Sequence, residues 1–131
     1  MRARCISEKP TPSLIKALGA NYREGKTVYP VTLGQEYTVL GIGFWDGVAW
    51  FEIAPSLSAI LSIPVSLFEL TDARLSRHWE ARIHHDGAFT LWPPSFYHEH
   101  YHYHVSEGHA EALEDFRYLF NLLESEAAAA P

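Results

Sequence analysis

The chain has very little cysteine, no long apolar run and no excess of positive charge. Its single cysteine, Cys5, excludes an internal disulfide, which is usual for proteins of reducing compartments. No stretch reaches the roughly 18 apolar residues of a membrane-spanning helix, and the basic residues at the start are not followed by the apolar segment of a signal peptide. We therefore expect a cytoplasmic protein without a membrane partner.

The motifs of the common enzyme classes are also missing. The sequence contains no P-loop, no G-x-S-x-G nucleophile motif and no G-x-G-x-x-G fingerprint. Cys5 and a histidine have the chemistry of a nucleophile pair, but nothing in the sequence places them together. The formal net charge is −6, and the basic stripe that nucleic-acid binding needs is lacking. We expect no catalysis, no cofactor and no nucleic-acid partner.

Apolar and aromatic residues are abundant, at 47% and 14% of the 131 positions. This composition is typical of one globular domain with a single core. We expect the domain over residues 1–126 and a disordered, alanine-rich tail over residues 127–131.

Two Asp-Gly pairs predict β-hairpins. Asp46-Gly47 lies between two runs of β-forming residues and favours a type I′ turn, and Asp86-Gly87 lies within a second such pattern. In the first strand, Gly41 and Gly43 indicate either a bulge or a close approach of another group. Pro64 breaks a later β-forming stretch into two short strands.

The last part of the sequence predicts an amphipathic helix over residues 107–125, with Ser106 as a candidate N-cap. Apolar side chains recur there at intervals of three and four, at Leu113, Phe116, Leu119, Phe120 and Leu123. We expect this stripe to face the core. The predicted fold is mainly β (α+β): a small, strongly bent sheet or SH3-like barrel of short antiparallel strands with a C-terminal amphipathic helix.

Two segments, TLGQEYTVLGIGFWDGVAWFEIA and IPVSLFELTD, resemble a group of small bacterial SH3-like proteins. The positions that carry the resemblance are Leu33-Gly34, Tyr37, Val39, Gly41-Ile42, Pro64, Leu67-Phe68-Glu69 and Asp72, and the step Ser76–Trp79 also matches. The resemblance covers roughly residues 1–120. Many such proteins belong to the immunity class of polymorphic and contact-dependent toxin systems.

The resemblance implies a protein that binds a cognate bacterial toxin tightly and neutralises it by occlusion. The matched positions are mostly turn glycines and core aromatics, so they imply the fold and identify no binding residue. The alternative is a small metal-binding or peptide-binding SH3-like protein without a toxin partner.

The most unusual stretch is SFYHEHYHYHV, in which four histidines alternate with other residues. We predict a strand over residues 97–105, with Tyr97, Tyr101, Tyr103 and Val105 on a core face and the histidines on an exposed face. Four imidazoles in line span about 20 Å and cannot share one ion. A zinc site would need one His-x-His pair and a third ligand, such as His84 or His85, from another strand.

Three other interpretations of the histidines stay open: a pH sensor, plain solvated surface, and a recognition surface. We favour recognition, because tyrosine and histidine combine an apolar body with a polar tip. The partner-binding candidates are His98, His100, His102, Tyr103, Trp45, Asp46, Glu52, Glu69 and Asp72. Two of Glu52, Glu69 and Asp72 could act as an acid–base pair, but carboxylates in hairpins and at strand ends are usually solvated. We expect a toxin with a basic binding surface and no structural metal.

Overall fold

The computed structural model describes residues 1–129, which form a mixed α+β fold. Its strands are β1 (Arg2–Cys5), β2 (Glu36–Thr38), β3 (Gly41–Trp45), β4 (Val48–Ile53), β5 (Leu61–Pro64), β6 (Phe68–Asp72), β7 (Glu80–Ile83) and β8 (Phe89–Trp92). Its helices are α1 (Pro12–Leu18), α2 (Tyr101–Ser106) and α3 (Ala110–Ala128), with short 3₁₀ turns at Gly19–Asn21, Val65–Leu67 and Pro94–Tyr97. The predicted combination of short antiparallel strands and a C-terminal helix is confirmed, but the fold is not mainly β, because about 33% of it is helix and about 27% is strand.

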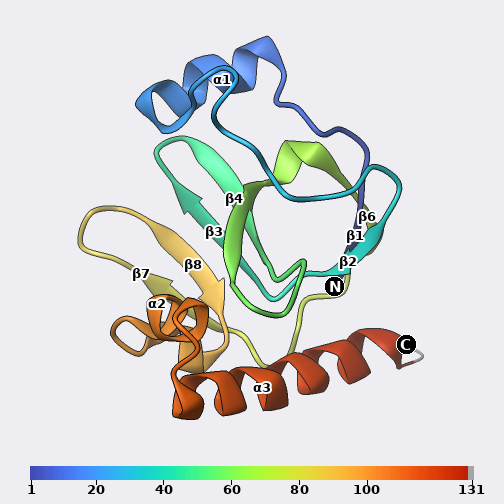
Figure 1. Ribbon diagram of the computed structural model, residues 1–131, viewed down its shortest axis with the longest axis vertical. Coiled ribbons are helices and arrows are strands. Elements are labelled where there is room, and N and C mark those ends of the chain that lie inside the picture. Colours follow the sequence, from blue (N-terminus) through green and yellow to red (C-terminus); the bar gives the residue numbers. More distant parts are fainter. Residues whose placement is uncertain (130–131) are drawn as a thin grey trace.

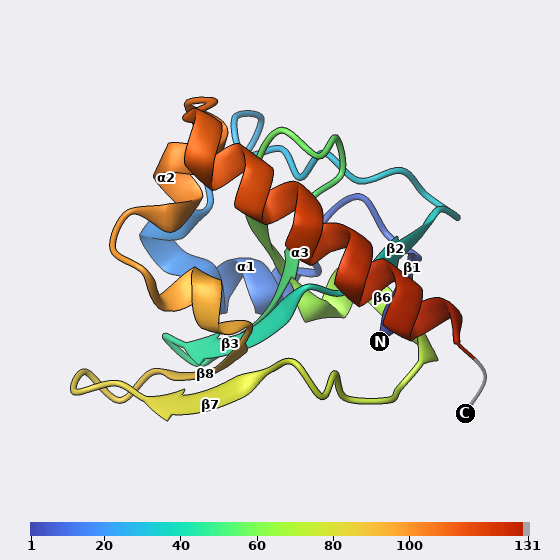
Figure 2. The same ribbon diagram turned by 90° about the horizontal axis from the view of Figure 1, so that it is seen from below.

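The strands lie in two antiparallel sheets (Figure 1). The smaller sheet has the order β2-β1-β6, and the larger one has the order β5-β4-β3-β8-β7. Within residues 1–129 the strands do not close into a barrel. α1 and α3 lie at opposite ends of the molecule in Figure 1, and Figure 2 shows α3 crossing from α2 toward the smaller sheet.

The two predicted hairpins are present. Asp46 and Gly47 join β3 to β4 with φ angles of 55° and 74°, the left-handed values that a type I′ turn requires. The two strands pair in unbroken register. The β7–β8 connection is wider: Gly87, with φ 91°, donates its N–H to the carbonyl of His84 at 2.9 Å. The predicted break at Pro64 also separates β5 from β6.

The main core lies between the two sheets. The smaller sheet contributes Ala3 and Cys5, and the larger sheet contributes Phe51 and Ile53 among others. Cys5 is 1% exposed, and its thiol donates to the carbonyl of Ser7 at 3.3 Å. Burial of these side chains supplies the main favourable term in folding.

The C-terminal helix starts later and ends later than predicted. Gly108 has a left-handed φ of 73° and ends α2, so α3 begins at Ala110 instead of residue 107. Ser106 is the last residue of α2 and not an N-cap. Residues 127–128 belong to α3, and residues 130–131 of the predicted tail lie outside the described residues. None of the helices within residues 1–129 has the length and apolar character needed to cross a membrane.

The apolar stripe of α3 packs as predicted. Phe116 is fully buried, and Leu113 and Phe120 pack against the same cluster. The cluster also holds Tyr101 and Val105 of α2. α3 therefore fixes α2 in place as well as covering the sheets.

The strand predicted over residues 97–105 is wrong, because the segment forms a 3₁₀ turn followed by α2. Tyr101 and Val105 are four residues apart, so they share one side of a helix as well as one side of a strand. Both are buried in the cluster around Phe116, and this packing decides in favour of the helix. Tyr103, which the strand would have placed on the core face, is 59% exposed on α2, and the four histidines do not form one row on a sheet.

Candidate functional site

One face of the five-stranded sheet is turned away from the core between the sheets. Along β4, Phe51 and Ile53 point into that core, whereas Trp50 and Glu52 point to the opposite face. α1 covers one end of this face through Leu18, which packs on Trp50. α2 and the turn before it cover another part, and a cleft lies between these covers.

The cleft is open and has a volume of about 450 Å³. Strands of the larger sheet supply its floor, and α2 with the preceding turn supplies a wall. Its lining residues are Trp45, Glu52, Ser62, Trp92, Phe96, His98, His100, Tyr101, His102 and Tyr103. The set combines aromatic rings with polar tips and includes no lysine or arginine. We call it the Glu52 cleft.

Two glycines of β3 make room for the tryptophans of the Glu52 cleft. A Cβ atom on Gly41 would lie 2.7 Å from Cδ1 of Trp92, and one on Gly43 would overlap the ring of Trp45. Only a residue without a Cβ lets both indoles lie against the strand. Of the two alternatives that the sequence left open for these glycines, the structure therefore shows the close approach.

Glu52 lies at the floor of the cleft and is 1% exposed. Ser62 donates its hydroxyl to Oε1 at 2.7 Å. His102 Nε2 lies 3.4 Å from Oε2 but outside hydrogen-bonding geometry, so Oε2 has no hydrogen-bond partner within residues 1–129. The prediction that Glu52 is solvated is wrong, because β4 lies inside the sheet between β3 and β5 and α2 covers it. A buried carboxylate with one unpaired oxygen is costly to the folded state.

Aromatic rings hold His102 above Glu52. The centroid of its imidazole lies 4.7 Å from that of the Phe96 ring, in an edge-to-face arrangement, and 5.7 Å from that of the Trp92 ring. Trp92 Nε1 is a second buried atom that lacks a hydrogen-bond partner within residues 1–129. The cleft therefore concentrates an acceptor and donors that the protein itself does not satisfy, next to apolar rings. This arrangement suits the binding of a polar group with an apolar stem.

The other histidines of the stretch do not gather at Glu52, although the ring centroids of His100 and His104 lie 6.1 Å apart. His100 takes a left-handed φ of 61° before α2, and its Nε2 lies 3.2 Å from Glu99 Oε1 at the surface. His104 stacks on His109 at 4.6 Å, outside the Glu52 cleft. Within the described chain, no group of three or more His, Cys, Asp or Glu side chains is placed to hold a metal ion.

The structure gathers most of the partner-binding candidates around one opening. The candidates that line the Glu52 cleft are Trp45, Glu52, His98, His100, His102 and Tyr103. Asp46 lies exposed in the β3–β4 turn and does not line the cleft. The remaining two candidates lie on β6, which belongs to the other sheet.

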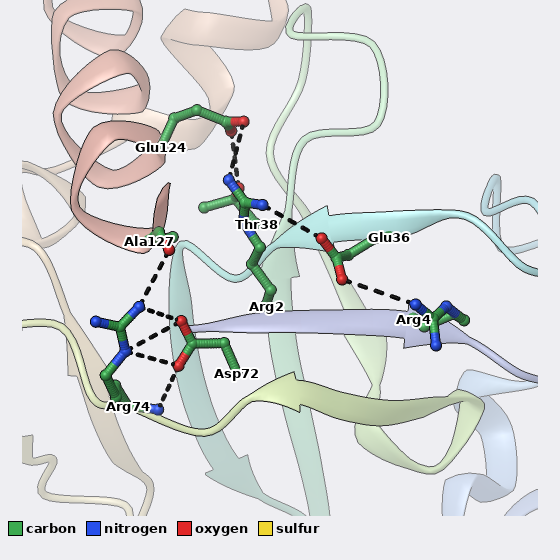
Figure 3. Close-up of polar contacts among 8 residues, drawn as sticks. All are labelled: Arg2, Arg4, Glu36, Thr38, Asp72, Arg74, Glu124 and Ala127. Atoms are coloured by element: carbon green, nitrogen blue, oxygen red, sulfur yellow. Dashed lines mark hydrogen bonds and ion pairs between the residues drawn. The ribbon is translucent and has the colours of Figure 1, made fainter. Parts of the chain in front are cut away.

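The two β6 carboxylates have arginine partners. Glu69 lies 3.3 Å from Arg4. Asp72 accepts hydrogen bonds from Arg74, including one from Nε at 2.9 Å (Figure 3). The hydrogen bonds from the Arg74 side chain and backbone hold the pKa of Asp72 well below its usual range. Both carboxylates are thus paired with arginines of the protein itself, and they lie on the sheet that does not line the Glu52 cleft.

Four cleft residues were not chosen from the sequence as site residues: Ser62, Trp92, Phe96 and Tyr101. Ser62 stands opposite Glu52 in the β4–β5 register, a pairing that only the assembled sheet reveals. Tyr101 is held by a hydrogen bond from its hydroxyl to Asp115 at 2.8 Å. Burial and this hydrogen bond raise the pKa of Tyr101, so the hydroxyl stays protonated as a donor.

No protein-family model, curated protein or solved structure matches the chain. The cleft combines a buried carboxylate, polar atoms without hydrogen-bond partners and aromatic side chains around one opening. That chemistry is suited to binding.

Proposed function

We propose that the protein is an immunity protein that binds a cognate bacterial toxin in the cytoplasm and neutralises it by occlusion. It acts by association alone, without a cofactor or a catalytic step of its own. The sequence resemblance supports this function. The observation that carries it is the gathering of the partner-binding candidates around the Glu52 cleft.

The rim of the cleft has the composition of a protein interface. Tyr103 is 59% exposed although it is aromatic, and His98 is exposed beside it. Trp45 stacks on Trp50 at 5.3 Å and forms the opposite side of the opening. Tyrosine and tryptophan are enriched among the residues that carry most binding energy, especially near a central pocket.

Charge supports a partner with a basic surface. Residues 31–106 carry eight carboxylates against three arginines, and the exposed side of α3 adds Glu111 and Glu114. Opposite charge raises the association rate of two proteins, and salt screens this effect. The association rate should therefore fall as the salt concentration rises, and a rate that does not depend on salt would contradict the electrostatic part of the proposal.

We also propose that the two-sheet fold is SH3-like, as the sequence resemblance implies. A second candidate function is a peptide-binding SH3-like protein without a toxin partner, which the open aromatic cleft also favours. A metal-binding version is less favoured, because the described residues bring no three metal ligands together.

Co-expression with the proteins encoded beside this chain tests the proposal. In the bacterium that encodes it, one neighbouring gene product should be toxic when expressed alone and harmless when this chain is present. The two proteins should elute as one complex in size-exclusion chromatography. The absence of both rescue and complex for every neighbouring product would contradict the immunity function and favour the peptide-binding candidate.

Substitutions at the rim test whether the cleft is the binding surface. The double variant His98→Ala/Tyr103→Ala should weaken toxin binding by about 1 kcal/mol or more in calorimetry, with thermal stability nearly unchanged, because both side chains are exposed. His85→Ala is the matched control, since His85 is exposed in the β7–β8 loop and does not line the cleft. Equal effects of the two variants would place the interface elsewhere.

A further inference from the structure

The Glu52 cleft contains a buried carboxylate without a lysine or arginine partner. Glu52 is the one charged side chain in the fully buried part of residues 1–129, and its Oε2 has no hydrogen-bond partner there. A buried charge is normally paired, because leaving it unpaired destabilises the folded state strongly. No lysine or arginine lines the cleft. The nearest basic group is the imidazole of His102, whose Nε2 makes no hydrogen bond to Oε2, so the protein itself supplies no permanent cation to pair with Glu52.

The walls around Glu52 have the chemistry that receives an organic cation. The faces and edges of Trp45, Trp92 and Phe96 border the cleft, and such rings attract an ammonium or guanidinium group. The same rings pack against the methylene stem of a long basic side chain. An anionic group would be repelled by Glu52, and a purely apolar group would leave its carboxylate unpaired.

We propose that the Glu52 cleft receives a lysine or arginine side chain of the bound partner, which pairs with Oε2 of Glu52. This inference rests on the proposed function for the identity of the partner as a protein. To that function it adds the two chemical groups that meet at the centre of the interface, a carboxylate of this chain and a cation of the partner. The acidic surface guides the basic partner at long range, and Glu52 supplies the short-range charge pair inside the cleft.

His102 stands at the entrance of this position. Its Nε2 lies 3.4 Å from Oε2, and its side chain is 30% exposed. Nε2 has no hydrogen-bond partner within residues 1–129, so this atom does not tie the ring in place. Turning the ring about its side-chain bonds exposes the carboxylate oxygen, and the incoming cation then replaces the imidazole as its neighbour.

The first experiment uses two small probes on the unaltered protein, so it depends on neither the partner nor a variant. n-Butylguanidinium carries the cation on an apolar stem, and n-butylurea is its neutral counterpart. In ¹H–¹⁵N NMR titrations, the cation should shift the Trp45 and Trp92 indole signals saturably, and the urea should bind at least about tenfold more weakly. Equal binding of the two probes, or no saturable shift with either, would overturn the proposal.

Glu52→Gln keeps the shape of the side chain and removes its charge. It should weaken n-butylguanidinium binding at least about tenfold. Glu114→Gln removes the same charge from the exposed surface of α3 and should leave binding unchanged. Equal losses in the two variants would show that only net charge matters and would overturn the proposal.

The last experiment uses the cognate toxin and separates this proposal from the proposed function. Double-mutant cycles between Glu52→Gln and each interfacial Lys or Arg of the toxin should find one basic residue with a coupling that Glu114→Gln does not show. A stable complex without such a coupling would overturn the cleft assignment and leave the immunity function intact. If no toxin complex forms, the immunity function fails, and the probe titrations still decide the chemistry of the cleft.

Discussion

The molecule places its carboxylates in two contrasting surroundings. Where β1, β2 and β6 meet the end of α3, carboxylates face arginines: Arg2 lies 3.3 Å from Glu36 and 3.7 Å from Glu124, and Asp72 is paired in the same way (Figure 3). We call this region the arginine junction. In the Glu52 cleft, the carboxylate is far more buried and yet has no lysine or arginine beside it; the imidazole of His102 lies 3.4 Å away and makes no hydrogen bond to it.

The difference shows where each region contributes. The junction pairs are partly exposed, and such pairs individually add little to stability, but together they tie the end of α3 to the smaller sheet. Arg74, for example, also donates to the carbonyl of Ala127 at 3.2 Å. Glu52, with its Oε2 unpaired, is instead expected to cost stability in the folded protein.

The largest expected effect comes from the helix that both regions share. Phe116 is fully buried and packs in the cluster that holds α2 against α3. Phe116→Ala should lower the free energy of unfolding by about 3 kcal/mol or more, because it leaves a cavity. Tyr118→Ala is the control, since Tyr118 is 71% exposed on the same helix. Chemical denaturation measures both, and a loss below about 1 kcal/mol for Phe116→Ala would mean that α3 does not pack on the core.

Gly41→Ala should damage the cleft from its floor. The new Cβ would lie 2.7 Å from Trp92 and 3.2 Å from the backbone oxygen of Leu91, so we expect a loss of about 1–3 kcal/mol. Gly43→Ala is the matched comparison. Its Cβ meets the Trp45 ring, which lies at the end of a strand and is half-buried, so the ring can move aside. A larger loss of stability for Gly43→Ala than for Gly41→Ala would contradict this assignment.

Asp72→Asn tests the arginine junction through pH. The pKa of Asp72 is lowered in the folded state, so the folded protein binds fewer protons than the unfolded chain in acid. Stability from this group is present above the ordinary Asp pKa of about 3.9 and is lost as the pH falls below it. The variant should lower the melting temperature at neutral pH and flatten its fall between pH 5 and about 2.

Glu69→Gln is the control for this pH profile, because Glu69 is 54% exposed opposite Arg4. It should change the melting temperature less than Asp72→Asn does. If Asp72→Asn and the unaltered protein lose stability in parallel on acidification, the Asp72 pair does not contribute as described.

Glu52→Gln should have the smallest effect on stability. The buried charge has no lysine or arginine partner and no hydrogen bond to His102, so its removal should leave the free energy of unfolding within about 0.5 kcal/mol or raise it. The hydroxyl of Ser62 retains an amide oxygen to donate to. Thermal melts of Glu52→Gln and Asp72→Asn under the same conditions compare the melting temperatures of the two variants directly. A larger loss for Glu52→Gln than for Asp72→Asn would reverse the contrast between the two regions.

Local signals in the sequence predicted much of the fold. The Asp46-Gly47 turn, the break at Pro64 and the apolar stripe around Phe116 are confirmed, because each depends on backbone chemistry or a repeat within one element. The division of the strands between two sheets was not predicted, because no single strand encodes its neighbours. The left-handed Gly108 was the available signal that two helices, and not one, follow residue 100.

The candidate site was predicted for a partly wrong reason. The alternation around His102 fits a strand, but Tyr101 and Val105 serve a helix equally well, and their burial against α3 selects it. Histidine and tyrosine still reach the cleft because α2 lies over the larger sheet. The burial of Glu52 was beyond prediction, since it depends on that helix covering a strand about 50 residues earlier in the chain.

The thiol of Cys5 gives the protein a reporter of its own opening. It is 1% exposed and belongs to the only cysteine of the sequence, so an alkylating reagent reaches it when β1 leaves the core. The labelling rate therefore measures this local opening without an added probe. Since β1 is the central strand of the smaller sheet, the label also follows the loss of the arginine junction. In oxidising buffer, two opened chains can join through this thiol, and because the linked sulfur cannot return to the core, the covalent dimer records a past opening.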